Sequence, residues 1–226
     1  MSAPMVLGPE AVTTFASVAS TAFALLLGAR FLLAAQRLGG LAVLRLPGLG
    51  FLGLALSAPL TLPAILDSPY GGWHVLHLVL QVASFTAIAL GYLLRARHGD
   101  SPEREPTIAY HVLLLCAVAL LVPFAVLSLT QTSLRAAVTV GHSFTALLVA
   151  GVTAHLAASG RTSLNRALVV VGYGWLAASQ VFLAAVAVAD AGLRSTLFTA
   201  ANLALVVGLA ALLLAMARDA RGGSAQ

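Results

Sequence analysis

Long runs of apolar residues, interrupted by short polar breaks, set the pattern of this chain. A helix that crosses the hydrocarbon core of a bilayer needs about 20 apolar residues, at a rise of about 1.5 Å each. Seven uncharged runs are long enough. The pattern therefore predicts an all-α bundle of seven transmembrane helices, over about 11–37, 46–66, 71–97, 107–130, 133–158, 164–189 and 194–218.

The breaks between these runs carry turn residues rather than further domains. Gly39-Gly40 and Ala191-Gly192 are typical turn pairs, and the longest break is the polar stretch RARHGDSPEREP over 95–106. None of the breaks has room for a soluble domain. We therefore expect a single transmembrane domain over 1–226, and the start MSAPMVLGPE, which lacks a basic region, predicts no cleavable signal peptide.

The composition indicates that lipid rather than water surrounds this bundle. Hydrophobic residues make up 60% of the 226 residues and charged residues only 8%, whereas soluble domains have about 25% charged residues. A chain so poor in charge predicts a multi-pass protein of the cell membrane, with the lipid bilayer as its main partner. All 12 basic residues are arginines, dispersed at the ends of the apolar runs, so no basic stripe for nucleic acid is formed.

The arginines also predict the orientation. Ten of them fall at one end of the predicted bundle and two, Arg135 and Arg194, at the other. Positive residues are enriched in cytoplasmic loops. The ten-arginine end is therefore expected to be cytoplasmic, with the N-terminus outside and the C-terminus inside.

Polar side chains concentrate at one depth of the predicted helices. Under this orientation, the outer halves of five helices hold Thr14, Ser17 and Thr21; His74, His77, Gln81 and Ser84; Thr139, His142 and Ser143; Ser179 and Gln180; and Ser195, Thr199 and Asn202. A polar side chain in hydrocarbon is costly without a partner, so these groups are expected to turn inward. They would form either interhelical hydrogen bonds, as serine and threonine commonly do, or a polar chamber.

A ligand or cofactor pocket in that outer half is our first hypothesis. The larger polar residues would line it, with two aromatic residues of the sixth predicted helix as possible walls. The candidate set is His77, Gln81, His142, Tyr173, Trp175, Gln180, Thr199 and Asn202. Three prolines, Pro59, Pro63 and Pro123, lie in outer halves of predicted helices, where they would either serve packing or open the bundle.

Haem is a second possibility, because axial imidazoles from two helices can hold its iron. His77 and His142 lie at the same predicted depth and are the candidate pair. His142 and His155 do not suit two stacked haems, since their 13-residue separation turns them about 220° apart around one helix. His155 is then expected at the cytoplasmic interface.

The stretch LFTAANLALVVGLAALLL, from Leu197 to Leu214, resembles the seventh helix of microbial rhodopsins. In that family an acidic residue stands five positions after the first leucine, and the retinal-binding lysine follows four residues later, directly before Val-Gly. Here Asn202 and Val206 occupy those two positions, before Val207-Gly208. The resemblance implies a rhodopsin-like bundle, but a chain with no lysine cannot form a retinal Schiff base.

Other chemistry finds little support in the sequence. There is no Gly-x-Ser-x-Gly, His-Glu-x-x-His or phosphate-binding loop, and no Asp or Glu in the middle of a predicted span. We therefore expect a non-enzymatic protein that binds a small molecule or acts as a sensor. The alternatives are a b-type haem electron-transfer subunit that uses His77 and His142, and a small transporter. An oligomer or a partner membrane protein is compatible with each.

Overall fold

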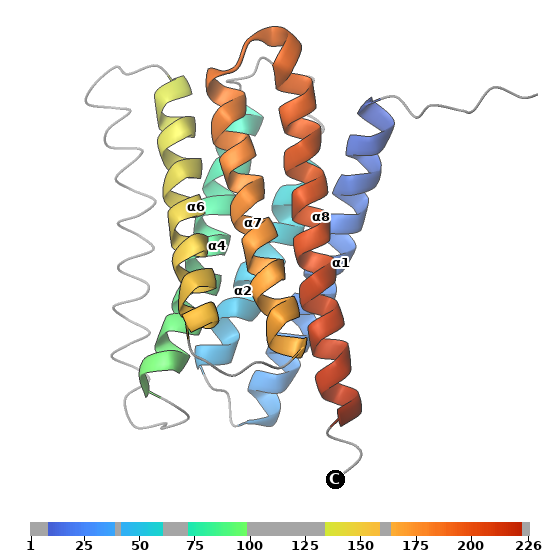
Figure 1. Cartoon of the computed structure of the whole chain (residues 1–226), viewed down its shortest axis with the longest axis vertical. Coiled ribbons are helices and arrows are strands. Elements are labelled where there is room, and N and C mark those ends of the chain that lie inside the picture. Colours follow the sequence, from blue (N-terminus) through green and yellow to red (C-terminus); the bar gives the residue numbers. More distant parts are fainter. Residues whose placement is uncertain (1–8, 39–41, 61–71, 99–133, 159–163, 223–226) are drawn as a thin grey trace, which may run out of the picture.

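The structure is a computed structural model, and it describes residues 9–38, 42–60, 72–98, 134–158 and 164–222. All regular structure in these ranges is helical (Figure 1). The elements are α1 (Pro9–Arg37), α2 (Ala42–Ser57), the 3-10 turn η1 (Ala58–Leu60), α4 (Gly72–His98), α6 (Leu134–Ala158), α7 (Leu164–Val188) and α8 (Ala191–Gly222). The helix expected over 107–130 lies outside the described residues.

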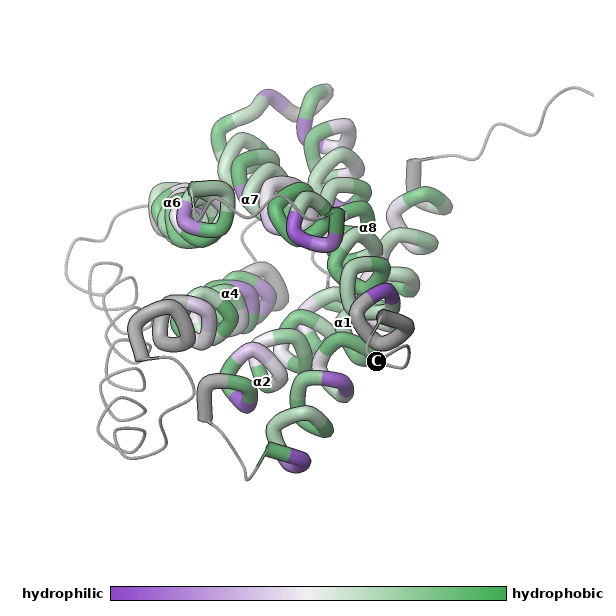
Figure 2. Tube along the Cα trace, turned by 60° about the horizontal axis from the view of Figure 1, so that its bottom comes forward, coloured by the Kyte–Doolittle hydropathy of each residue, from purple (hydrophilic) through white to green (hydrophobic). Residues whose placement is uncertain are grey.

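The six α-helices form a closed ring. Each one contacts the next along the chain, α1 with α2, α2 with α4, α4 with α6, α6 with α7 and α7 with α8, and α8 returns to α1. Seen obliquely from one end, α6, α7 and α8 form one row and α4, α2 and α1 the other (Figure 2). Side chains from any of the six helices can therefore meet in one shared interior.

Four of the described helices are long and apolar enough to cross a membrane. They are Ala11–Arg37, Val138–Ala158, Leu164–Val188 and Gly192–Arg218, and two shorter apolar stretches cover Leu44–Leu60 and Leu76–Tyr92. Large apolar side chains on these helices point out of the ring, for example Phe15 at 70% and Leu147 at 74% exposure. Such outward apolar faces suit lipid as the surrounding solvent.

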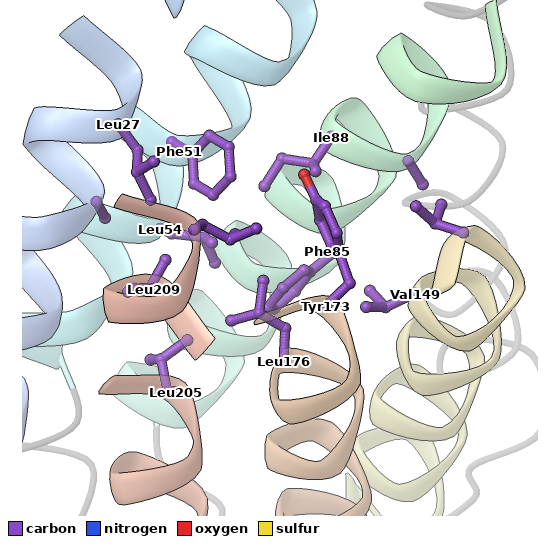
Figure 3. Close-up of a cluster of buried hydrophobic side chains, with 14 of the residues drawn as sticks. Leu27, Phe51, Leu54, Phe85, Ile88, Val149, Tyr173, Leu176, Leu205 and Leu209 are labelled. Atoms are coloured by element: carbon purple, nitrogen blue, oxygen red, sulfur yellow. The ribbon is translucent and has the colours of Figure 1, made fainter. Parts of the chain in front are cut away.

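A hydrophobic core fills the centre of the ring. Each helix contributes to it, with Leu27, Phe51, Leu54, Phe85, Ile88, Val149, Tyr173, Leu176, Leu205 and Leu209 at its heart (Figure 3). Every one of these side chains is at least nine-tenths buried. The core ties all six helices into one packing unit.

Two pairs of glycines bring neighbouring helices into close contact. A Cβ on Gly48 would lie 2.9 Å from Leu32 and 3.3 Å from the carbonyl oxygen of Gly28, where α1 crosses α2. A Cβ on Gly208 would lie 2.8 Å from the carbonyl oxygen of Gly172, where α8 crosses α7. Small residues at membrane helix crossings allow this approach of backbones, so both antiparallel pairs are joined in the same way.

The second helix ends earlier than the apolar pattern predicts. The sequence favours a continuous helix over 46–66, but α2 stops at Ser57 and a 3-10 turn holds Pro59. Proline has no N–H to donate to a helical carbonyl, which weakens the α-helix just before it. The freed carbonyl oxygens of Ser57 and Ala58 accept hydrogen bonds from side chains of other helices. Pro63 and Pro123 lie outside the described residues.

Candidate functional site

The inner faces of three helices place amide and imidazole side chains together. His77 and Gln81 are four residues apart on α4, so they share one face. His142 lies on α6 and Gln180 on α7, and all four side chains are at most 1% exposed. The site is therefore built from regular helices around the ring, and each helix orients its own polar residue.

A chain of hydrogen bonds links these side chains across the ring. His142 Nδ1 donates to Gln180 Oε1 over 2.9 Å, and Gln180 Nε2 donates to Gln81 Oε1 over 3.0 Å. Gln180 Nε2 also lies 3.4 Å from Ser179 Oγ. The bonds join α6 to α7, which are neighbours in the ring, and α7 to α4, which face each other across its interior.

A second set of bonds ties this chain to the end of α2. His77 Nδ1 donates to the Ser57 carbonyl over 2.9 Å, and Ser17 Oγ donates to the Ala58 carbonyl over 2.7 Å. Because His77 is one turn from Gln81, the two sets form one layer. The polar layer is defined by five side chains: Ser17, His77, Gln81, His142 and Gln180. It draws on α1, α4, α6 and α7 and on the broken end of α2.

The polar layer has no buried acidic or arginine side chain beside it in the described residues. No Asp, Glu or Arg is buried in the described part of the chain, where the buried polar side chains are those of Ser, Thr, His, Gln and Asn. In the same residues, no group of three or more His, Cys, Asp or Glu could hold a metal ion. Neutral hydrogen bonding is thus the chemistry that the layer offers.

The candidate residues of α8 face α1. Thr199 Oγ1 lies 3.4 Å from Thr13 Oγ1, and the Asn202 side chain donates from Nδ2 to the Phe198 carbonyl of its own helix over 2.9 Å. Asn202 is buried, whereas Val206, at the position that corresponds to the retinal lysine, is half-buried. The hydrogen bonds of these residues in the described structure go to α1 and to α8 itself, so Thr199 and Asn202 act here as helix-contact groups.

The two aromatic candidates of α7 have different positions. Tyr173 is 1% exposed and belongs to the hydrophobic core, whereas Trp175, two residues further on, is 43% exposed. Residues two apart on a helix point about 200° apart. The structure therefore brings Tyr173 into the interior and leaves Trp175 on the outer surface.

The histidines of α6 differ in the way that their spacing predicts. His142 is 0% exposed, and His155 is an exposed residue near the end of α6. The side chains of the other three histidines, His74, His98 and His111, lie outside the described residues. Only His77 and His142 can therefore be placed in the interior.

Sequence reasoning missed two buried threonines that lie one and two residues from the polar residues it favoured. Thr13 and Thr145 are buried, whereas Thr14 and Ser143, which the depth pattern favours, are exposed. Thr145 Oγ1 donates to the Gly141 carbonyl of its own helix over 2.9 Å, which lets a threonine sit in an apolar surrounding. Such residues can be found from the direction in which the apolar side chains of the whole helix point. A local cluster of polar residues does not show which of them is buried, because its side chains spread over too many directions around the helix.

Comparisons with known proteins add no relative to this picture. No family model, no curated protein and no solved structure matches the chain. The polar layer itself therefore carries the functional argument.

Proposed function

We propose that this chain is a seven-helix integral membrane protein that binds a small molecule at the polar layer and is not an enzyme. The four long apolar helices and the outward-facing apolar side chains support a bundle in lipid. The arginine distribution supports an outer N-terminus and a cytoplasmic C-terminus in the cell membrane. A sensory role suits a polar layer whose side chains, in the described residues, are hydrogen-bonding groups without a carboxylate. With no lysine, any retinoid would be held without a covalent bond.

The observation that carries this proposal is the fully buried Gln180, which bonds His142 and Gln81 at once. Leucine at these positions would hold three helices together with no desolvation penalty. Buried polar groups in a membrane bundle are expensive and are typically functional. The amides and imidazoles also offer both donors and acceptors in a fixed arrangement, which is what a neutral polar head group requires.

The test is to purify the protein from its producing cells and analyse the bound organic-soluble compounds by mass spectrometry. Wild type should retain a compound that Gln180→Leu loses, because leucine can neither donate nor accept a hydrogen bond. Thr145→Val is the matched control, since Thr145 is equally buried but bonds only its own helix. An identical set of compounds in wild type and Gln180→Leu would contradict the proposal.

A b-type haem between His77 and His142 is the second candidate, and one observation favours it. Both imidazoles are held through Nδ1, to the Ser57 carbonyl and to the Gln180 amide oxygen. Metal-ligating histidines usually donate their other ring N–H in this way. An absorption spectrum separates the candidates: a haem band that vanishes in His142→Ala and persists in His155→Ala supports haem, and a colourless protein contradicts it.

A further inference from the structure

The two buried histidines of the polar layer face partners of different kinds. His77 Nδ1 lies 2.9 Å from the Ser57 carbonyl oxygen, and His142 Nδ1 lies 2.9 Å from Gln180 Oε1. A backbone carbonyl can only accept a hydrogen bond, so His77 must carry a proton on Nδ1. A side-chain amide accepts at one end and donates at the other, so the orientation of the Gln180 amide decides which role His142 Nδ1 must take.

The structure shows the first of two possible hydrogen-bond patterns. His142 donates from Nδ1 to Gln180 Oε1, and Gln180 Nε2 donates to Gln81 Oε1 over 3.0 Å. Gln180 Nε2 also lies 3.4 Å from Ser179 Oγ, whose own hydrogen goes to the Leu176 carbonyl. Gln180 therefore turns its oxygen toward α6 and its nitrogen toward α4.

A second pattern joins the same side chains by the same number of bonds. When both amides turn over, Gln180 Nε2 donates to His142 Nδ1, and Gln81 Nε2 donates to Gln180 Oε1. His142 then carries its proton on Nε2. The Ser179 hydroxyl suits both patterns, since it can donate as well as accept and its hydrogen can rotate. The oxygen and nitrogen of an amide are so alike in shape that the turn needs no backbone movement.

We infer that the polar layer is a two-state switch, in which the amides of Gln180 and Gln81 turn over together and the proton of His142 moves from Nδ1 to Nε2. The Nδ1–H bond breaks, an Nε2–H bond forms, and a water molecule that enters the layer carries the proton, so the charge does not change. The two patterns have equal numbers of hydrogen bonds, so their populations should differ by less than about tenfold. This inference goes beyond the proposed function, because neither pattern needs a ligand.

Such a switch would couple two helices that lie on opposite sides of the ring. A change on α6 that favours one tautomer of His142 alters, through Gln180, whether Gln81 on α4 accepts or donates. A two-state element whose equilibrium both sites bias is the physical basis of coupling between them.

The first test reads the histidine tautomers by nitrogen NMR in nanodiscs of phosphatidylcholine. Chemical shifts distinguish a protonated ring nitrogen from an unprotonated one. In a background variant that keeps only His77 and His142, His77 should show the Nδ1–H form alone. His142 should show both neutral forms, as two sets of signals or as one averaged set. A single form of His142, whether neutral or doubly protonated, would overturn the inference.

A second measurement uses wild type, so it does not depend on the folding of a variant. With isotope-labelled histidine and glutamine nitrogens, a scalar coupling across a hydrogen bond should join Gln180 Nε2 and His142 Nδ1. An N–H···N bond between these atoms exists only in the second pattern, because in the first pattern His142 donates to oxygen. If no coupling joins the two nitrogens, the switch is wrong.

The third test separates a coupled switch from a histidine that changes tautomer alone. Gln81→Met keeps a long, neutral side chain that cannot donate, so the second pattern loses its bond to Gln180 Oε1. The Nε2–H form of His142 should then fall by about threefold. Thr145→Val, whose wild-type hydroxyl bonds the Gly141 carbonyl of its own helix, is the control and should leave the populations unchanged. Equal populations in Gln81→Met and wild type, or an equal fall in Thr145→Val, would rule out the coupling through Gln180.

Discussion

The crossing of α7 and α8 should be sensitive to a single added methyl group at Gly208. A Cβ there would lie 2.8 Å from the Gly172 carbonyl oxygen and 2.9 Å from Leu176 Cδ2, while ordinary contact begins at 3.4 Å. The backbone oxygen cannot rotate away as a side chain can. Gly208→Ala therefore forces the two helices apart by about 0.6 Å at this point.

The energetic effect has two opposing parts. Overpacking a tight contact costs about 1–3 kcal/mol, and a gap of about 0.5–1 Å forfeits about a quarter to a half of the dispersion energy of the contacts around it. Alanine in place of glycine within a helix recovers about 1 kcal/mol. Gly208→Ala should then be destabilised by about 0–2 kcal/mol.

Gly174 provides the matched control. It lies on α7 two residues from Gly172, and a Cβ there would meet nothing within 4 Å. Gly174→Ala gains the same helix propensity with no overpacking, so it should be more stable than Gly208→Ala by about 1–3 kcal/mol. Reversible unfolding by sodium dodecyl sulfate in mixed micelles, followed by circular dichroism, measures the difference. Equal stabilities for the two variants would refute the close crossing of α7 and α8.

Three further predictions concern hydrogen bonds. Gln180→Leu removes a partner from both His142 Nδ1 and Gln81 Oε1, so it should lose about 1–3 kcal/mol in the same assay, whereas Thr145→Val should change stability by less. Ser17→Ala leaves the Ala58 carbonyl without its side-chain donor, so the variant should lose about 1 kcal/mol of stability. Hydrogen exchange at the end of α2 should then be faster than in wild type, and unchanged exchange would contradict the role of Ser17. Arg194 Nε donates to the Ala189 carbonyl just past the end of α7, and Arg194→Gln should lose about 0.3–1 kcal/mol, an effect that salt should reduce if it is electrostatic.

Apolar run length predicted much of the helical framework. The all-helical fold is confirmed, and four of the described helices are long enough to cross a membrane. Angular spacing also separated His142 from His155 correctly, because a rigid helix converts sequence distance into direction. The sequence likewise placed His77, Gln81 and Gln180 at one depth, although it could not show which atoms bond. A count of seven helices and their orientation stay predictions.

Two features could not be read from run length. The end of α2 depends on which donors bond the carbonyl oxygens before Pro59. In the structure these donors are the side chains of His77 and Ser17, which belong to other helices. The outward position of Trp175 depends on how α7 is rotated about its own axis within the ring. The residue type does not decide this position, because an aromatic side chain suits lipid as well as an interior. Tertiary contacts decide both features, and those contacts are long-range in sequence.

The two kinds of contact divide the ring along its axis. On α7 the close contact at Gly172 comes before Gln180, and on α8, which runs the opposite way, the close contact at Gly208 comes after Asn202. The close contacts of both helices therefore lie toward one end of the ring, and their polar groups lie toward the other end. The α1–α2 pair does the same, with Gly28 following Ser17 on α1 and Gly48 preceding the broken end of α2. Close backbone contacts hold the helices together at one end, within the apolar part of the interior. At the other end the same helices are joined by side-chain hydrogen bonds, which can exchange one partner for another with little backbone movement. A ligand at the polar layer would therefore act on the hydrogen-bonded end, and its binding should slow hydrogen exchange most in the turns of α4 and α7 that carry Gln81 and Gln180.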